Sequence, residues 1–386
     1  MAGGFGCVET HITHGACAYP ITSSTTMGTC YETAVSNGKK NLWGDTLTFV
    51  QPESEHSAAT TCEGFALAGG RVTNFTSGQG LVLMKEVLYT ISGKRLPVVF
   101  HIGARALTSH SLNVHCGHDD VMSVADCGWG ILFGRNAQEA CDIALIARRA
   151  AEASETPFMN VQDGFLTTHT IENIKLPETE FMKEYAGDPN TKLRCLFDPR
   201  TPIMTGVVQN QDSYRKGKIA QRTFYDKGPA AVQGAMDLLY AKTGRRYRMV
   251  DTYRMDDGEY ALVGMGGMMK TAQAAADYMR DEMDLKVGVV HVTCFAPFPA
   301  TQLVDALKHV RAMTVLERMD NPLAQSNPLV QGIKASFADA LTGLSYGSNG
   351  EFKYPKITSI PKIYACSAGL GSRDVRAGHL ISVVQN

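Results

Sequence analysis

The sequence predicts an α/β protein whose parallel β-sheets are covered by helices. Two stretches of the chain indicate this class. In residues 57–161, short apolar strands recur about every 30 residues with helical segments between them, which is typical of βαβ units. From about residue 248, the order strand, glycine turn, helix and strand appears again.

The first stretch alternates between helix and strand over its whole length. Residues 96–102 are an apolar run of strand length, whereas residues 136–152 have apolar positions at helical spacing behind Asn136, a residue type that caps helix N-termini. In chain order, the sequence predicts helices at 57–68, 81–91, 119–127 and 136–152, and strands at 71–75, 96–102, 130–133 and 157–161.

The second stretch has the order of a Rossmann-type unit. It predicts strands at 260–264, 287–292 and 312–317, and helices at 268–283 and 301–308. The turn Met265-Gly266-Gly267 lacks the third glycine of the dinucleotide fingerprint, so a tight strand-to-helix turn is expected there and not a cofactor site.

A polar region separates the two stretches. Residues 178–230 contain the basic run Arg215-Lys216-Gly217-Lys218 and are expected to be a linker or an arm on the surface, with the basic run solvated. The chain is therefore divided into a first domain at 1–235, which includes this arm, and a second domain at 245–386.

Composition excludes several classes of protein. The chain has 386 residues with 37 Lys and Arg against 38 Asp and Glu, a balance that argues against a general nucleic-acid binder. No apolar run reaches the ~18 residues of a membrane span, and no Lys or Arg precedes Lys39 as a signal peptide would require. A cytoplasmic protein is expected.

The ten cysteines are expected to be structural. No C-x-x-C pair occurs, so the chain cannot build a zinc ribbon or an iron–sulfur cluster locally. His110, His115, His118, Asp119 and Asp120 lie close in sequence, but their spacing matches no known ligand motif, and no metal site is predicted.

Three loops carry candidate functional residues. They are the segments 18–25 (AYPITSST), 53–57 (ESEHS) and 101–107 (HIGARAL). Each also has a structural interpretation, since hydroxyl groups cap helices and acids favour helix N-termini. Arg105 follows a buried strand directly, where ligands bind in parallel sheets, and its planar guanidinium suits a carboxylate.

Together these loops resemble a known family. The resemblance rests on five segments in matching order and spacing: YPITSST, ESEHSAA, TNFTSGQGLVLM, HIGARALTSHSLNVHCGHDDVM and FMNVQDGFLTTH. They are similar to the 2-oxoacid:ferredoxin oxidoreductases, of which pyruvate:ferredoxin oxidoreductase is the best-known member. Further segments, GRRYRMVDTYRMDD, ALVGMGG and VGVVHVTCFAPFP, resemble the second domain of the same proteins.

The resemblance implies a fold and a reaction. The first domain would be a thiamin-binding-fold pyrimidine domain, and the second a transketolase-C-terminal-like, Rossmann-type domain. The implied reaction is the oxidative decarboxylation of a 2-oxo acid with coenzyme A to an acyl-CoA and CO2. Thiamin diphosphate supplies the carbanion chemistry in such enzymes, and iron–sulfur clusters remove the electrons to ferredoxin.

The resemblance also implies roles for individual residues. Glu55 would hydrogen-bond the aminopyrimidine ring of thiamin, Arg105 would bind the substrate carboxylate, and Thr22 would bind the substrate by a hydrogen bond. Pro20 and Ile21 would lie on the cofactor beside Thr22. Two further residues, Leu112 and Val114, would line the substrate pocket.

The chain would act as an α subunit. The G-D-G…N motif that holds the diphosphate and Mg²⁺ is not found in the sequence, nor are cluster cysteines. A β subunit carrying thiamin diphosphate, Mg²⁺ and iron–sulfur clusters is therefore expected, with further γ and ferredoxin-like δ subunits.

Several alternatives remain at this level. The substrate is pyruvate or else an aromatic or branched 2-oxo acid of the phenylglyoxylate type, with an acceptor that is ferredoxin or NAD. Val114 would leave a roomier pocket than a longer side chain. Two other classes are a stand-alone transketolase-like enzyme, which would need its own diphosphate motif, and a non-catalytic scaffold, which would be expected to lack Glu55 or Arg105.

Overall fold

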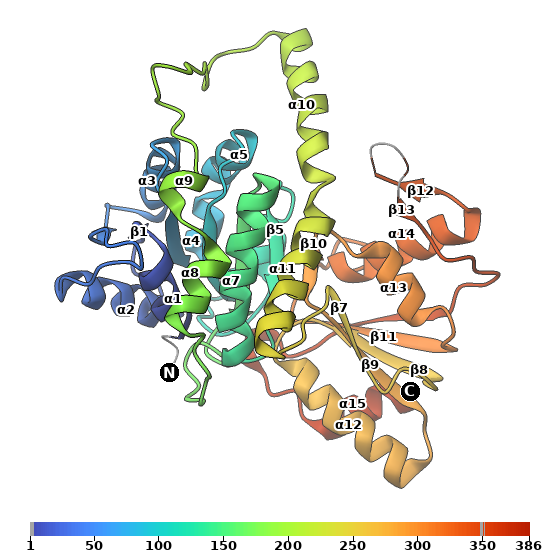
Figure 1. The fold of residues 1–386 in the computed structure, drawn as a ribbon. Helices are drawn as coiled ribbons and strands as arrows, with labels where there is room; N and C mark the ends of the chain where they lie inside the picture. Colours follow the sequence, from blue (N-terminus) through green and yellow to red (C-terminus); the bar gives the residue numbers. More distant parts are fainter. Residues whose placement is uncertain (1–3, 348–349, 351) are drawn as a thin grey trace.

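The computed structural model describes residues 4–347, 350 and 352–386. Within these residues the strands form a seven-stranded sheet, a five-stranded sheet and a two-stranded ribbon, β12 (Ser345–Tyr346) with β13 (Phe352–Lys353). Figure 1 shows the two large sheets side by side, each between layers of helices. The predicted α/β class is confirmed.

The first sheet has the strand order β10-β5-β6-β4-β3-β1-β2, and all its strands except β10 run parallel. Its strands are β1 (Gly15–Cys17), β2 (Thr48–Val50), β3 (Val72–Thr76), β4 (Val99–Ala104), β5 (Gly130–Phe133), β6 (Phe158–Asp163) and β10 (Cys294–Ala296). Strand β10 comes from the second half of the chain and pairs antiparallel with β5. The two halves therefore share a sheet.

Helices cover both faces of the first sheet. The helices on one face are α3 (Glu55–Leu67), α4 (Gly78–Leu83), α5 (Lys85–Gly93) and α6 (Asp119–Ser123). Those on the other are α1 (Gly4–Ile12), α2 (Thr25–Ser36), α7 (Ala137–Ser154), α8 (Thr179–Ala186) and α11 (Gly228–Thr243). Alternate residues of β4 face the two layers, with Phe100 in one apolar core and Val99 in the other.

The second sheet has the order β14-β11-β8-β9-β7, with β7 antiparallel at one edge. Its strands are β7 (Val250–Tyr253), β8 (Tyr260–Gly264), β9 (Val287–Val292), β11 (Ala312–Glu317) and β14 (Lys362–Ser367). Helices α12 (Met268–Met283) and α15 (Ala377–Gln385) pack on one face, and α13 (Ala300–Leu307) and α14 (Pro328–Thr342) on the other. A short 3₁₀ helix, η1 (Leu370–Ser372), follows β14.

The region predicted as a linker or surface arm contains helices. Besides α8, it includes α9 (Pro189–Lys192) and α10 (Gln211–Tyr225). Helix α10, which is described in full, has no buried residue and projects from the body of the molecule (Figure 1). It carries the basic run, which is exposed as expected. The segment is therefore partly helical, and α10 lies on the surface as an arm.

Two predicted helices have different limits in the structure. The single helix expected at 81–91 is two helices, α4 and α5, which meet at Met84. The helix expected at 119–127 ends at Ser123, whose hydroxyl donates to the Asp120 carbonyl and so competes with the helical backbone bond. The N-cap predicted at Asn136 is confirmed, since its side chain accepts from the Glu139 N–H at 2.9 Å.

The boundary predicted between domains, near residue 240, stays a prediction. None of the described helices is both long and apolar enough to cross a membrane.

Candidate active site

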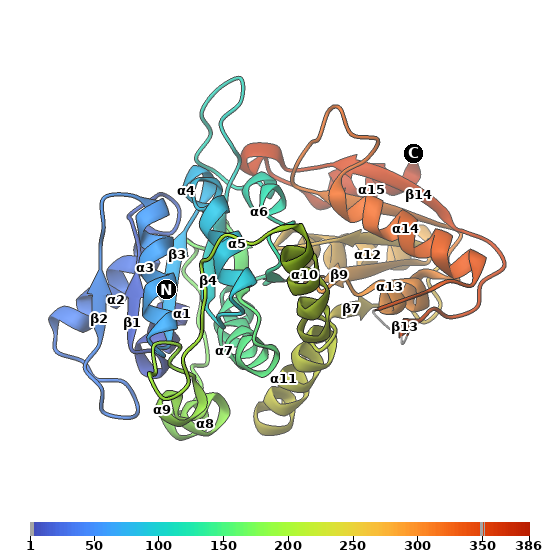
Figure 2. The same cartoon turned by 90° about the horizontal axis from the view of Figure 1, so that it is seen from above.

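The candidate site residues gather at one edge of the first sheet. Because β1, β2, β3, β4 and β6 run parallel, the loops that follow them all begin at their carboxyl ends. The three loops singled out from the sequence are among these segments. Figure 2 shows the loop between β4 and α6 standing out beside α4. The fold therefore brings the predicted loops together.

A glycine turn lies at the centre of this edge. Gly78, Gln79 and Gly80 open α4 directly after β3. A β-carbon on Gly80 would lie 2.8 Å from Cγ and Oε1 of Glu55 and 2.9 Å from Oγ1 of Thr76, so only glycine leaves room for these groups. The turn thus places the Glu55 carboxylate against the end of β3.

Glu55 is the first residue of α3, which begins two residues earlier than predicted. Ser54 caps the helix, its side chain accepting from the Ser57 N–H at 3.2 Å. Glu55 is half-buried, and no described residue donates a hydrogen bond to its carboxylate. The neighbouring Thr76 Oγ1 is buried and also lacks a partner within the described residues. Two polar groups without a partner among the described residues therefore lie on either side of Gly80, and the role of Glu55 on thiamin stays a prediction.

Arg105 is buried at the end of β4, with 5% of its surface exposed. Its Nη1 donates to the Thr22 carbonyl at 2.5 Å and its Nε to the Asn113 carbonyl at 3.5 Å. Burial lowers the pKa of Arg105, and the nearby Asp120 carboxylate offsets part of this effect. No described carboxylate forms an ion pair with the guanidinium, which leaves it available to an anionic ligand.

The first loop meets Arg105 through its backbone. Thr22 is exposed and holds the arginine by its carbonyl, while Ile21 is half-buried and Pro20 exposed. Ser24 occupies the N-cap position of α2 but makes no capping bond there, because its hydroxyl donates to the Ile21 carbonyl at 2.9 Å. The structure thus brings Thr22 and Arg105 together and corrects the expected cap.

The predicted pocket-lining residues lie on the loop between β4 and α6. Leu112 is 64% exposed and Val114 is half-buried. The loop is closed by the bond from the Ala106 N–H to the His115 carbonyl at 3.0 Å. Their roles as lining residues stay predictions.

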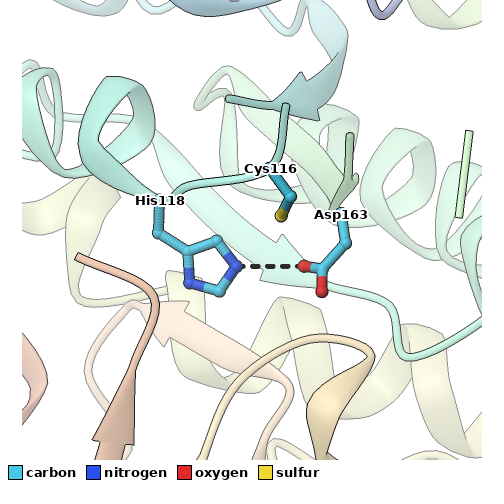
Figure 3. A group of neighbouring side chains, drawn as sticks. All are labelled: Cys116, His118 and Asp163. Atoms are coloured by element: carbon cyan, nitrogen blue, oxygen red, sulfur yellow. Dashed lines mark hydrogen bonds and ion pairs between the residues drawn. The ribbon is translucent and has the colours of Figure 1, made fainter. Parts of the chain in front are cut away.

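The histidine and aspartate residues near this loop do not gather as one group. His110 and His115 are exposed, and the His115 ring packs on Phe165 at 4.7 Å between centroids. His118 instead meets Cys116 and Asp163, as Figure 3 shows. Local sequence patterns do not predict this cluster, because Asp163 lies 45 residues from His118.

The cluster of Cys116, His118 and Asp163 is best described as a network of charges and hydrogen bonds. The three residues are buried, and their ligand atoms lie within 4.8 Å of one another. However, Oδ1 of Asp163 accepts from the His118 ring at 3.0 Å, and its Oδ2 accepts from the Gly267 N–H at 3.0 Å. Arg318 adds a guanidinium 3.3 Å from Oδ2. The Arg318 guanidinium beside these groups disfavours a metal ion, and the absence of a metal site stays a prediction.

Asp163 joins the two halves of the chain. It ends β6 of the first sheet, whereas Gly267 precedes α12 and Arg318 follows β11 of the second. Burial alone would raise the pKa of Asp163, but the His118 hydrogen bond and the charges of His118 and Arg318 hold it below its ordinary value.

Replacing Asp163 by Asn is expected to lower the free energy of unfolding by about 3–5 kcal/mol, because buried charges would lose their partner. The lowered pKa means that this stabilisation is present at neutral pH and is lost as the pH falls through the carboxyl's folded-state pKa. Thermal unfolding of wild type and variant should therefore converge in acid. The control, Asp126→Asn, removes a 60% exposed carboxylate paired with Lys85 and should change stability little. Equal effects of both variants would contradict this account.

The cysteines mostly agree with the structural interpretation. Nine free cysteines are described, six of them buried, while Cys195 is exposed and Cys30 and Cys366 are partly exposed. The side chain of Cys7 lies outside the described residues.

Sequence reasoning missed several groups of this site. Asn113 and Asp120 bond Arg105, and Thr76 lies beside Gly80 with Glu55. All three lie within the segments that carry the resemblance, but the sequence assigns them no role. The only sequence signal for Asp120 was that it follows Asp119 at the start of a predicted helix. Acidic residues are common at helix N-termini in proteins of every function.

Comparison with family models matches both halves of the chain. Residues 10–237 match the pyruvate flavodoxin/ferredoxin oxidoreductase, thiamine-diphosphate-binding domain. Residues 258–356 match core domain II of pyruvate:ferredoxin oxidoreductase.

Curated relatives agree with these matches. The chain is 34% identical over 351 residues to the pyruvate-flavodoxin oxidoreductase of Klebsiella pneumoniae, and this alignment covers 89% of the chain and 30% of the relative. It is 32% identical over 373 residues to a pyruvate-flavodoxin oxidoreductase of Nostoc sp. (strain ATCC 29151 / PCC 7119), covering 95% of the chain and 87% of that relative. For the Klebsiella pneumoniae relative and for other curated relatives that match, the chain spans about 30% of the relative's length.

A solved structure has the same fold. A 2-oxoglutarate:ferredoxin oxidoreductase from Magnetococcus marinus, with 2-oxoglutarate, coenzyme A and succinyl-CoA bound, matches with a TM-score of 0.68 and 16% identity, over 100% of this chain and 63% of that one. At that identity the match shows the fold alone. Family models and curated relatives together confirm the family predicted from the motifs: the chain belongs to the pyruvate flavodoxin/ferredoxin oxidoreductases, within the 2-oxoacid:ferredoxin oxidoreductase family.

Proposed function

We propose that the chain is the α subunit of a 2-oxoacid:acceptor oxidoreductase. The reaction converts a 2-oxo acid and coenzyme A to an acyl-CoA and CO2, and two electrons pass to ferredoxin or flavodoxin. Pyruvate is the proposed substrate, since the relatives above are named for it. An aromatic or branched 2-oxo acid is the alternative, because Val114, if it lines the pocket as predicted, would leave more room than a longer side chain.

One observation supports this function above the others. Arg105 is a buried guanidinium at the carboxyl end of a central strand, and none of the described carboxylates is in ion-pair contact with it, although the Asp120 charge lies nearby. A buried charge without a partner is unfavourable, so an anionic substrate would gain a strong, charge-assisted contact there. The carboxylate of a 2-oxo acid supplies such an anion. The exposed Thr22 beside it can donate its hydroxyl to the same substrate.

The residues around Glu55 fit the pyrimidine side of thiamin diphosphate. When bound, this cofactor supplies the carbanion chemistry by which a 2-oxo acid loses CO2. Glu55 would hold a proton at a ring nitrogen, in a position fixed by the start of α3 and by contact with Gly80. Pro20 and Ile21 would lie beside the same ring.

Partner chains would complete the enzyme. A β subunit would hold the diphosphate, its Mg²⁺ and iron–sulfur clusters, and γ and ferredoxin-like δ subunits would be further members of the complex. The sequence shows neither the G-D-G…N motif nor cluster cysteines, and this supports the division.

The test is a substrate panel on the purified complex. Reduction of ferredoxin would be followed with pyruvate, 2-oxoglutarate, phenylglyoxylate and a branched 2-oxo acid, with and without coenzyme A, and with NAD as a second acceptor. We expect reduction of ferredoxin that requires coenzyme A, with the highest kcat/KM for pyruvate. A preference for phenylglyoxylate would overturn the proposed substrate, and no reduction with any 2-oxo acid would overturn the proposed function.

A further inference from the structure

Asp120 lies behind the candidate site, at the start of α6, and its side chain is completely buried. Its Oδ2 accepts hydrogen bonds from two backbone N–H groups, that of Gly78 at 2.7 Å and that of Arg105 at 3.0 Å. Its Oδ1 accepts from the N–H of Val121 at 2.7 Å. A single buried oxygen therefore joins the glycine turn after β3 to the end of β4.

Both backbone segments that Asp120 holds carry groups of the site. Gly78 has φ +54, and a β-carbon there would lie 3.1 Å from Cδ and Nε of Arg105, so the turn packs directly on the arginine side chain. Two residues further along the same turn, Gly80 lies against Glu55. A displacement of Asp120 would move the backbone at Gly78, against which the Arg105 side chain packs. It would also move the backbone of Arg105 itself.

The surroundings of Asp120 are unusual for a buried carboxylate. Such groups are normally paired with a cation, but no described residue forms an ion pair with Asp120. Burial raises the pKa of Asp120 to about 7, although the three N–H donors favour its ionised form. An apolar residue would fill this space without the desolvation cost. What the carboxylate adds is the fixed geometry of three short, charge-assisted hydrogen bonds.

We propose that Asp120 is a positioning residue that fixes Arg105 and the glycine turn, and thereby sets how strongly the site binds the substrate carboxylate. This inference rests on the proposed role of Arg105. Asp120 touches neither substrate nor cofactor, so it acts only through its hold on the two backbone segments.

The test compares a charged ligand with a neutral one in the holoenzyme complex. The KM of the 2-oxo acid would be measured beside the inhibition constant of the neutral amide of the same acid. A general structural defect weakens both ligands, whereas a misplaced Arg105 weakens only the acid. We expect Asp120→Ala to raise the KM of the acid about 10- to 100-fold, as a small misplacement of a binding group can do, with little change for the amide.

A conservative variant and a matched control sharpen the result. Asp120→Asn should raise the KM less, because its amide oxygen can still accept from Gly78 and Arg105. If Asp120→Ala does not fold, the same comparison is made with Asp120→Asn. Asp119→Asn changes the adjacent, half-buried carboxylate, which bonds neither backbone segment, and should resemble wild type. An unchanged KM, or equal weakening of acid and amide, would overturn the proposal.

Arg105→Met separates the two proposals. If that variant leaves the ratio of acid to amide affinity as in wild type, the carboxylate role of Arg105 itself fails. If it abolishes the preference for the acid while the folded Asp120 variants keep it, the proposed function stands and the positioning role of Asp120 is wrong.

Discussion

Replacing Arg105 by Met is expected to lower kcat/KM for the 2-oxo acid on the order of 10²- to 10³-fold while the complex still assembles. The guanidinium is buried and has no counterion among the described residues, so the substrate carboxylate would lose its only proposed cation. Methionine keeps much of the volume of the side chain, so packing against Gly78 should survive.

Steady-state kinetics with native mass measurement would check this result. Arg105→Lys retains the charge but loses the planar fork, so it should fall between wild type and the Met variant. Arg311→Met, which changes a 70% exposed arginine directly before β11, should leave the kinetics unaltered. Full activity of Arg105→Met with unchanged KM would show that the carboxylate binds elsewhere.

Glu55→Gln is expected to lower kcat about 10²- to 10⁴-fold, the range for loss of a group that transfers or holds a proton. Glutamine has nearly the same shape, so α3 and its contact with Gly80 should persist. The KM for the 2-oxo acid should change little, because Arg105 is untouched. The direct measurement is exchange of the C2 proton of bound thiamin diphosphate, which should slow together with kcat.

The chain offers a matched control two residues away. Glu53 is exposed and hydrogen-bonded to the Ser57 hydroxyl, and it lies outside α3. Glu53→Gln should therefore leave both kcat and proton exchange near wild type. If Glu53→Gln and Glu55→Gln behaved alike, or if exchange stayed normal in Glu55→Gln, the assignment of Glu55 would be wrong.

Features that depend on local sequence were predictable. The apolar run that forms β4 placed Arg105 at a strand end, and Asn136 capped its helix as its residue type suggests. Acids favour helix N-termini, so the start of α3 could be placed near Glu55, although the helix begins two residues earlier than predicted. These patterns depend on residues a few positions apart, and tertiary packing does not override the local structure that they favour.

Features that depend on distant contacts could not be read from the sequence. Strand β10 belongs to the second half of the chain but pairs with β5 of the first half. The Asp163 carboxylate reaches Gly267, which is 104 residues away. Asp120 accepts from Gly78 across 42 residues. Such contacts arise from tertiary packing between segments far apart in the chain, and local patterns in a single sequence do not show which segments meet.

The most direct test of the central claim is an anaerobic native purification through a tag on this chain, followed by assays of bound thiamin diphosphate and iron. The account predicts a complex in which a second chain carries a G-D-G…N motif and cluster cysteines, with both cofactors present. A chain that purifies alone with neither cofactor, while the neighbouring genes are fully expressed, would contradict it. So would an isolated chain that binds thiamin diphosphate and turns over a 2-oxo acid without a partner.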